Sequence, residues 1–140
     1  MKLAFGILIL SGFFNYSYAR GMTKKDTVFY YIDTLKTPVK DRMISVEMDK
    51  AFKFYTINCY CLSSDNPPVF RTNVTKQTLL SKSEFKKLTF ISLTRLIELV
   101  RKNDDRHFDE KYVIYFIEPA GNKYAKLKAF FLGGHVTILN

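Results

Sequence analysis

The sequence predicts an α+β fold, in which an antiparallel sheet is packed on one face by one long helix or two short ones. Segments rich in β-branched and aromatic residues stand before and after a central segment with helical spacing of its apolar residues. Turn-forming residues separate these segments. The order strands, helix, strands is typical of α+β proteins, so we expect an N-terminal meander and a C-terminal hairpin to form the sheet.

The composition is that of an ordinary globular protein. The chain has 140 residues, of which 47% are hydrophobic and 25% are charged. These values exclude wholesale disorder, collagen-like repeats and a multi-pass membrane protein. We find no internal repeat and no linker, and we therefore expect a single domain over residues 27–140, preceded by a flexible arm over residues 20–26.

Residues 1–19 have the pattern of a secretory signal peptide. Lys2 precedes an apolar run over residues 3–14, and Ser17 and Ala19 occupy the −3 and −1 positions of a cleavage site. The run is about 12 residues long, whereas a membrane span needs roughly 20. An uncleaved signal anchor is the alternative. We expect an exported protein without a transmembrane segment after cleavage, periplasmic in a Gram-negative host and secreted otherwise.

The N-terminal half is expected to contain three strands and a short edge strand. The alternation of Ile44, Val46 and Met48 with polar residues predicts a half-buried strand over residues 42–48. A tight connection at Asp49-Lys50 would lead into the next strand; one bent strand through residues 43–62 is the alternative. The four expected strands cover residues 27–35, 42–48, 52–62 and 69–75, with turns or loops at 36–41 and 63–68.

The helical segment begins at a capping box formed by Ser81 and Glu84, and it extends at least through Leu88. Apolar residues at 90–91 interrupt the helical spacing, which resumes over residues 93–100. We expect either one long helix or two short ones, with Ser92 capping the second. Residues 103–111 are expected to form a charged loop.

The C-terminal part predicts a β-hairpin. Residues 112–117 and 123–132 have strand composition, and residues 119–122 contain proline, glycine and asparagine, which are typical of a turn. Two glycines at 133–134 end the second strand, and a last short strand is expected at 135–139.

Cys59 and Cys61 are the only cysteines. On a flat strand their Cα atoms would lie about 6.5–7 Å apart, at the upper limit for a disulfide. We favour two buried free thiols, with a strained local disulfide or an intermolecular pair as the alternative. Half of a metal or redox site is the third interpretation, but no further ligand pair and no Cys-x-x-Cys spacing support it.

We find no catalytic, metal or cofactor motif, so we expect a protein without enzymatic activity. If the protein were an enzyme, the best candidate active site would be His107 with the acidic residues of its loop, Asp104, Asp105, Asp109 and Glu110. A solvated loop explains the same residues. The triplet that begins at Asn73 fits the N-glycosylation pattern, which matters only in a eukaryotic host.

The basic charge supplies the candidate binding residues. Loss of Lys2 with the signal peptide would lower the net charge from +9 to +8. Tyr124, Lys126 and Lys128 share one side of the strand over residues 123–132, because alternate residues of a strand face the same way. We expect these three side chains to contact a partner. Nucleic acid is disfavoured, since the chain has an export signal and no recognition motif.

We therefore hypothesise a small exported, non-catalytic binding protein, such as an inhibitor, an immunity-type protein or an accessory subunit. Its partner would be another protein with an acidic surface. The first alternative is a binder of anionic envelope glycan or lipid. The second alternative is a small exported hydrolase.

Overall fold

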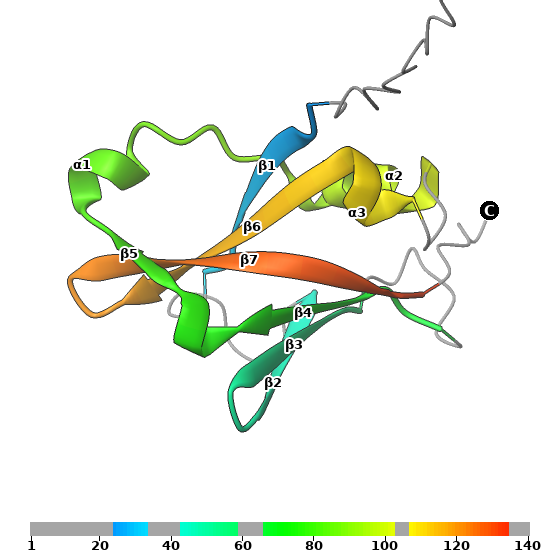
Figure 1. Cartoon of the computed structure of the whole chain (residues 1–140), viewed down its shortest axis with the longest axis horizontal. Helices are drawn as coiled ribbons and strands as arrows, with labels where there is room; N and C mark the ends of the chain where they lie inside the picture. The colour runs from blue at the N-terminus through cyan, green and yellow to red at the C-terminus, as the bar shows by residue number, and fades with distance from the viewer. Residues whose placement is uncertain (1–23, 34–42, 59–65, 103–106, 135–140) are drawn as a thin grey trace, which may run out of the picture.

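The protein has a mixed α+β fold with a mostly antiparallel, open sheet of seven strands, as predicted from the order of the elements (Figure 1). The computed structural model describes residues 24–33, 43–58, 66–102 and 107–134. The strand order is β1-β6-β7-β4-β3-β2, and β5 pairs with β7. The strands are β1 Asp26–Tyr31, β2 Ile44–Asp49, β3 Phe52–Ile57, β4 Val69–Asn73, β5 Thr78–Leu80, β6 Tyr112–Ala120 and β7 Lys123–Gly133.

The predicted C-terminal hairpin is confirmed as β6 and β7, which lie in the middle of the sheet. Its turn is shorter than expected, because Pro119 and Ala120 still belong to β6. Gly121 has a φ of 62°, in the left-handed region that glycine adopts without steric penalty, so the chain reverses over two residues.

The hairpin of β2 and β3 is also confirmed, and it excludes one bent strand through residues 43–62. Its tight connection contains Lys50, whose φ is 53°. Several sequence-based expectations concern residues outside the described part of the chain. These are the signal peptide, the turn at 36–41, the strand at 135–139, and Cys59 and Cys61 at the end of the strand expected over 52–62.

The prediction that the first strand belongs to an N-terminal antiparallel meander is wrong. This strand pairs in parallel with β6 instead of antiparallel with β2. Aromatic contacts favour that position: Phe29 stacks on Tyr115 with ring centroids 5.7 Å apart, and Tyr30 meets Phe116 edge-on at 6.0 Å. The expectation that β4 is an edge strand is also wrong, because β4 lies between β3 and β7.

The helical segment forms two separate helices, α1 Lys82–Phe85 and α2 Leu93–Lys102. The capping box of Ser81 and Glu84 is present, although α1 ends before Leu88. The Ser92 hydroxyl accepts a hydrogen bond from the Arg95 N–H at 3.2 Å, at the start of α2. Among the described residues no helix is long and apolar enough to cross a bilayer.

The prediction of a charged loop over residues 103–111 is wrong at its C-terminal end. Residues Phe108–Lys111 form a third helix, α3. Phe108 is completely buried and packs against the rings of Phe70 and Phe131, with centroid distances of 5.9 and 5.0 Å. Burial of this one ring outweighs the polarity of its neighbours.

The helices cover both faces of the sheet, which differs from the one-sided arrangement expected from the sequence. Leu96 and Val100 of α2 and Phe108 of α3 belong to the main core, together with Phe70 of β4 and Phe116 of β6. In contrast, α1 lies on the opposite face. There the Phe85 ring stacks on Tyr124 of β7, with the centroids 3.8 Å apart and the planes 10° apart.

The core face also carries a buried polar cluster. Lys53 Nζ lies 2.5 Å from Glu118 Oε2, and the Tyr55 hydroxyl donates a hydrogen bond to Glu118 Oε1 at 3.0 Å. Glu118 is only 4% exposed. Burial, followed by the negative charge of Glu118, raises the pKa of Tyr55. The Lys53 ammonium and the Tyr55 hydroxyl together compensate a carboxylate that has left water.

A candidate cationic groove

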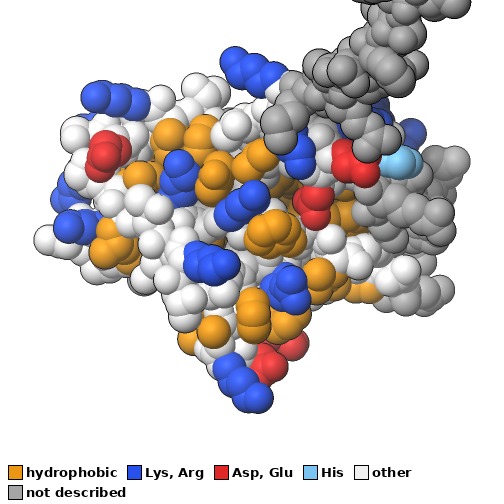
Figure 2. Space-filling model, in the orientation of Figure 1, with side chains coloured by type: hydrophobic (Ala, Val, Ile, Leu, Met, Phe, Trp, Pro, Cys, Tyr) orange, Lys and Arg blue, Asp and Glu red, His pale blue; other side chains and the backbone are white. Residues whose placement is uncertain are grey.

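Strand β7 separates the core from the candidate site. Its residues 125, 127, 129 and 131 are buried in the core, whereas residues 124, 126, 128 and 130 lie on the opposite face. Because α1 covers that face only near Tyr124, the middle of the face stays open. Figure 2 shows Lys and Arg side chains interspersed with hydrophobic ones across it.

The open face is hollowed into a groove with a volume of about 630 Å³. Strands β3, β4, β6 and β7 form its floor, and the 3₁₀ turn η2 (Val74–Lys76) and β5 contribute to its wall. The residues that line it are Phe52, Arg71, Thr72, Asn73, Lys76, Thr78, Tyr115, Lys126, Lys128 and Phe130.

The groove is positively charged. Four of its lining residues are cationic, and no acidic residue is among the described residues that line it. Within the described part of the chain, none of the four forms an ion pair with a carboxylate. The cations are Arg71, Lys76, Lys126 and Lys128. Like charges in a concavity add to one positive potential, which attracts anionic groups from solution.

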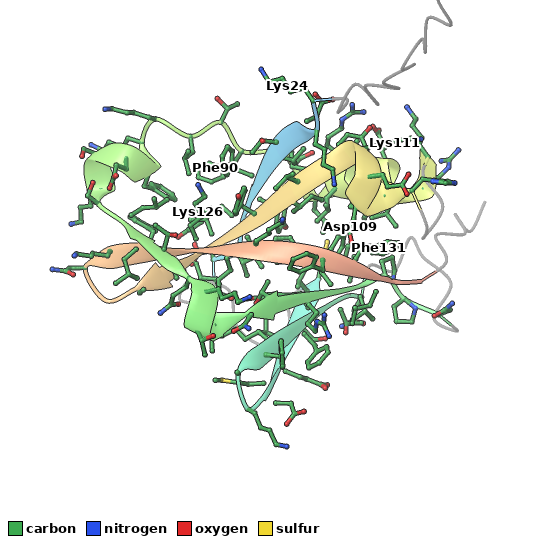
Figure 3. All side chains as sticks on the ribbon, in the orientation of Figure 1. Lys24, Phe90, Asp109, Lys111, Lys126 and Phe131 are labelled. Atoms are coloured by element: carbon green, nitrogen blue, oxygen red, sulfur yellow. The ribbon has the colours of Figure 1, made fainter. Side chains whose placement is uncertain are left out.

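Aromatic rings hold three of these cations. Lys126 Nζ lies 4.4 Å from the centroid of the Tyr115 ring, and Figure 3 shows this side chain projecting from β7 toward the side on which Phe90 lies. Lys128 Nζ lies 5.1 Å from the Phe130 centroid, and Arg71 Cζ lies 5.1 Å from the Phe52 centroid. Such contacts attract a cation to a ring face without neutralising its charge. The rings therefore hold the cations without neutralising them, and the charge of Lys128 acts in addition on the Asp109 carboxylate.

The three residues predicted to contact a partner are not all in the groove. Lys126 and Lys128 are both in it. Tyr124 lies on the same side of β7 but is half-buried against Phe85, and it lines a smaller pocket of about 190 Å³ beside Tyr31. Packing by α1 therefore separates Tyr124 from the two lysines.

Sequence reasoning missed Arg71, Lys76 and the supporting rings. Alternation along β4 was the available signal, because it places Arg71 opposite the buried Phe70 and Thr72. The missing information was strand pairing. Arg71 lies beside Phe130 only because β4 pairs with β7 in that register.

Asn73 lies in the wall of the groove. Its side-chain oxygen accepts hydrogen bonds from the Thr75 N–H at 2.9 Å and from the Thr75 hydroxyl at 2.7 Å. The same residues form the N-glycosylation triplet seen in the sequence. A carbohydrate attached to Asn73 would therefore stand at the groove.

Among the described residues of this loop, His107, Asp109 and Glu110 do not form a metal-binding cluster. His107 Nδ1 lies 3.0 Å from Glu110 Oε2, and both side chains are exposed. Asp109 lies beside Phe131 (Figure 3). Burial raises the pKa of Asp109, opposed by the Phe131 N–H and by the charges of Lys25 and Lys128. Residues 104 and 105 are outside the described part of the chain. In that part no three His, Cys, Asp or Glu side chains are placed to hold a metal ion.

Comparisons with protein-family models, with curated proteins and with solved structures found no match for this chain.

Proposed function

We propose that this protein is an exported, non-catalytic binding protein whose cationic groove contacts an acidic surface of another protein. An inhibitor, an immunity-type protein and an accessory subunit all act in this way. The observation that carries the proposal is the groove itself, in which four cations and no described acid line one concavity. Removal of a signal peptide would leave a net charge of +8, which would steer an acidic partner toward the groove.

Two features of the site favour a protein partner over an envelope glycan. The faces of Tyr115 and Phe52 are already approached by cations, so a sugar ring would compete with these cations for stacking. In addition, Phe130 and Leu132 are exposed next to the charged part of β7. Protein–protein interfaces typically combine an apolar patch with polar residues around it.

Affinity capture from envelope and secreted fractions tests the proposal. The bait is compared with a groove variant, Lys126→Glu with Lys128→Glu. A control variant carries Lys86→Glu and Lys87→Glu, which change the net charge equally at exposed positions just after α1. We expect one stoichiometric protein on the bait and on the control, and its loss from the groove variant.

Two results would contradict the proposal. If the groove variant retains the same protein as fully as the bait does, the groove is not the contact surface. If only glycan or lipid is recovered, and is released as the salt concentration rises, the protein binds envelope material instead.

A further inference from the structure

We propose that the groove and the end of β7 beyond it bind an extended segment of the partner in which acidic and apolar side chains are segregated. The segment has acidic side chains at two alternate positions, followed by apolar side chains at two further alternate positions. This inference rests on the proposed function and specifies the ligand of the same site.

The pattern of the ligand follows from the outer face of β7. Lys126 and Lys128 lie in the groove, and the next two residues on that face are Phe130, 39% exposed, and Leu132, 49% exposed. Two cations therefore precede two apolar side chains along one strand. Arg71 and Lys76 add positive charge at the floor and wall of the groove.

The spacing of these residues suits an extended chain. Alternate residues of a strand are about 6.5–7 Å apart, and an extended ligand repeats its side chains on one face at the same interval. A ligand lying along β7 would therefore place one side chain over each of the four positions.

Synthetic heptapeptides titrated into the full chain test this inference. The first peptide is Glu-Ser-Glu-Ser-Leu-Ser-Leu, with the reversed sequence included because the ligand has two directions along β7. The second, Glu-Ser-Leu-Ser-Glu-Ser-Leu, has the same composition but interleaves the acidic and apolar residues. A third, Glu-Ser-Glu-Ser-Ser-Ser-Ser, lacks the apolar half. Heparin and vesicles of phosphatidylglycerol represent the other anionic classes.

We expect the segregated peptide, in one direction, to bind about fivefold more tightly than the interleaved one, because only it buries both leucines against the apolar end. The variant Phe130→Ser with Leu132→Ser should lose this preference and bind the segregated and interleaved peptides equally. The variant Lys126→Glu with Lys128→Glu should weaken binding of every peptide about tenfold. The control variant at Lys86 and Lys87 should behave like the unchanged protein.

Different results would overturn the extended acidic–apolar ligand and the acidic protein partner. Equal affinity for the segregated and interleaved peptides would overturn the inference and leave an acidic protein partner standing. Binding of heparin or vesicles without binding of any peptide would overturn both. A preference that survives the Phe130→Ser and Leu132→Ser changes would also overturn the inference, since the apolar contacts would then lie elsewhere.

Discussion

Replacing Lys53 with methionine should strongly destabilise the protein, although the side chains are similar in length. Lys53 Nζ is the cation next to Glu118, a carboxylate that is only 4% exposed. After the change, Glu118 would keep only the hydrogen bond from Tyr55 among the described residues, and it would be a buried charge with no counter-ion among them.

The expected loss in the free energy of unfolding follows from how exposed Lys53 and Glu118 are. Removing one partner of a fully buried ion pair lowers the free energy of unfolding by about 3–5 kcal/mol. The Lys53 side chain is 27% exposed, so water partly screens this pair. We therefore expect a loss of about 2–3 kcal/mol, a large share of the roughly 5–15 kcal/mol that stabilises a typical domain.

Denaturant unfolding of single and double variants measures this loss. Glu118→Gln removes the charge but keeps an acceptor for the Tyr55 hydroxyl. In the double variant, Lys53→Met with Glu118→Gln, most of the stability lost by Lys53→Met alone should return, because no unpaired charge remains. If Lys53→Met loses less than about 0.5 kcal/mol, or if the losses simply add in the double variant, the Lys53 charge does not stabilise the buried Glu118.

Three further changes test particular contacts. The φ of Gly134 is 130°, and in Gly134→Ala the new Cβ would clash with the Pro68 backbone, so the thermal midpoint should fall further than in Gly121→Ala, where nothing lies within 4 Å. Ser81→Ala should lower the free energy of unfolding by about 1 kcal/mol in denaturant titrations, because the α1 capping box loses its hydroxyl. Because the pKa of Tyr55 is raised in the folded state, stability should fall as pH rises above about 10, and Tyr55→Phe should flatten that part of a pH–stability curve.

The sequence predicted the local elements better than their partners. Alternation and capping depend on neighbouring residues, so the β2–β3 and β6–β7 hairpins and the Ser81 cap could be predicted. The parallel pairing of β1 with β6 joins residues more than 80 positions apart, and it depends on long-range ring packing such as Phe29 on Tyr115. Nothing in the local pattern of β1 specifies that partner.

Only the groove residues that lie on a single strand, β7, could be predicted from the sequence. Alternation along β7 identified Lys126 and Lys128 as residues of one face. Arg71 and Phe52 reach the groove through the pairing of β4 with β7 and with β3, which the sequence does not specify. Tyr124 was included for the same reason as the lysines, but the Phe85 ring of α1 covers it.

NMR mapping of a glutamate-rich peptide on the ¹⁵N-labelled chain tests most directly whether the groove is the binding surface. We expect the amide shifts to concentrate around Arg71, Lys126 and Lys128, and we expect Lys126→Glu with Lys128→Glu to reduce them strongly at the same peptide concentration. If the shifts instead spread over exposed lysines such as Lys86 and Lys87 and stay unchanged in that variant, the general positive charge attracts the peptide and the groove is not its binding surface.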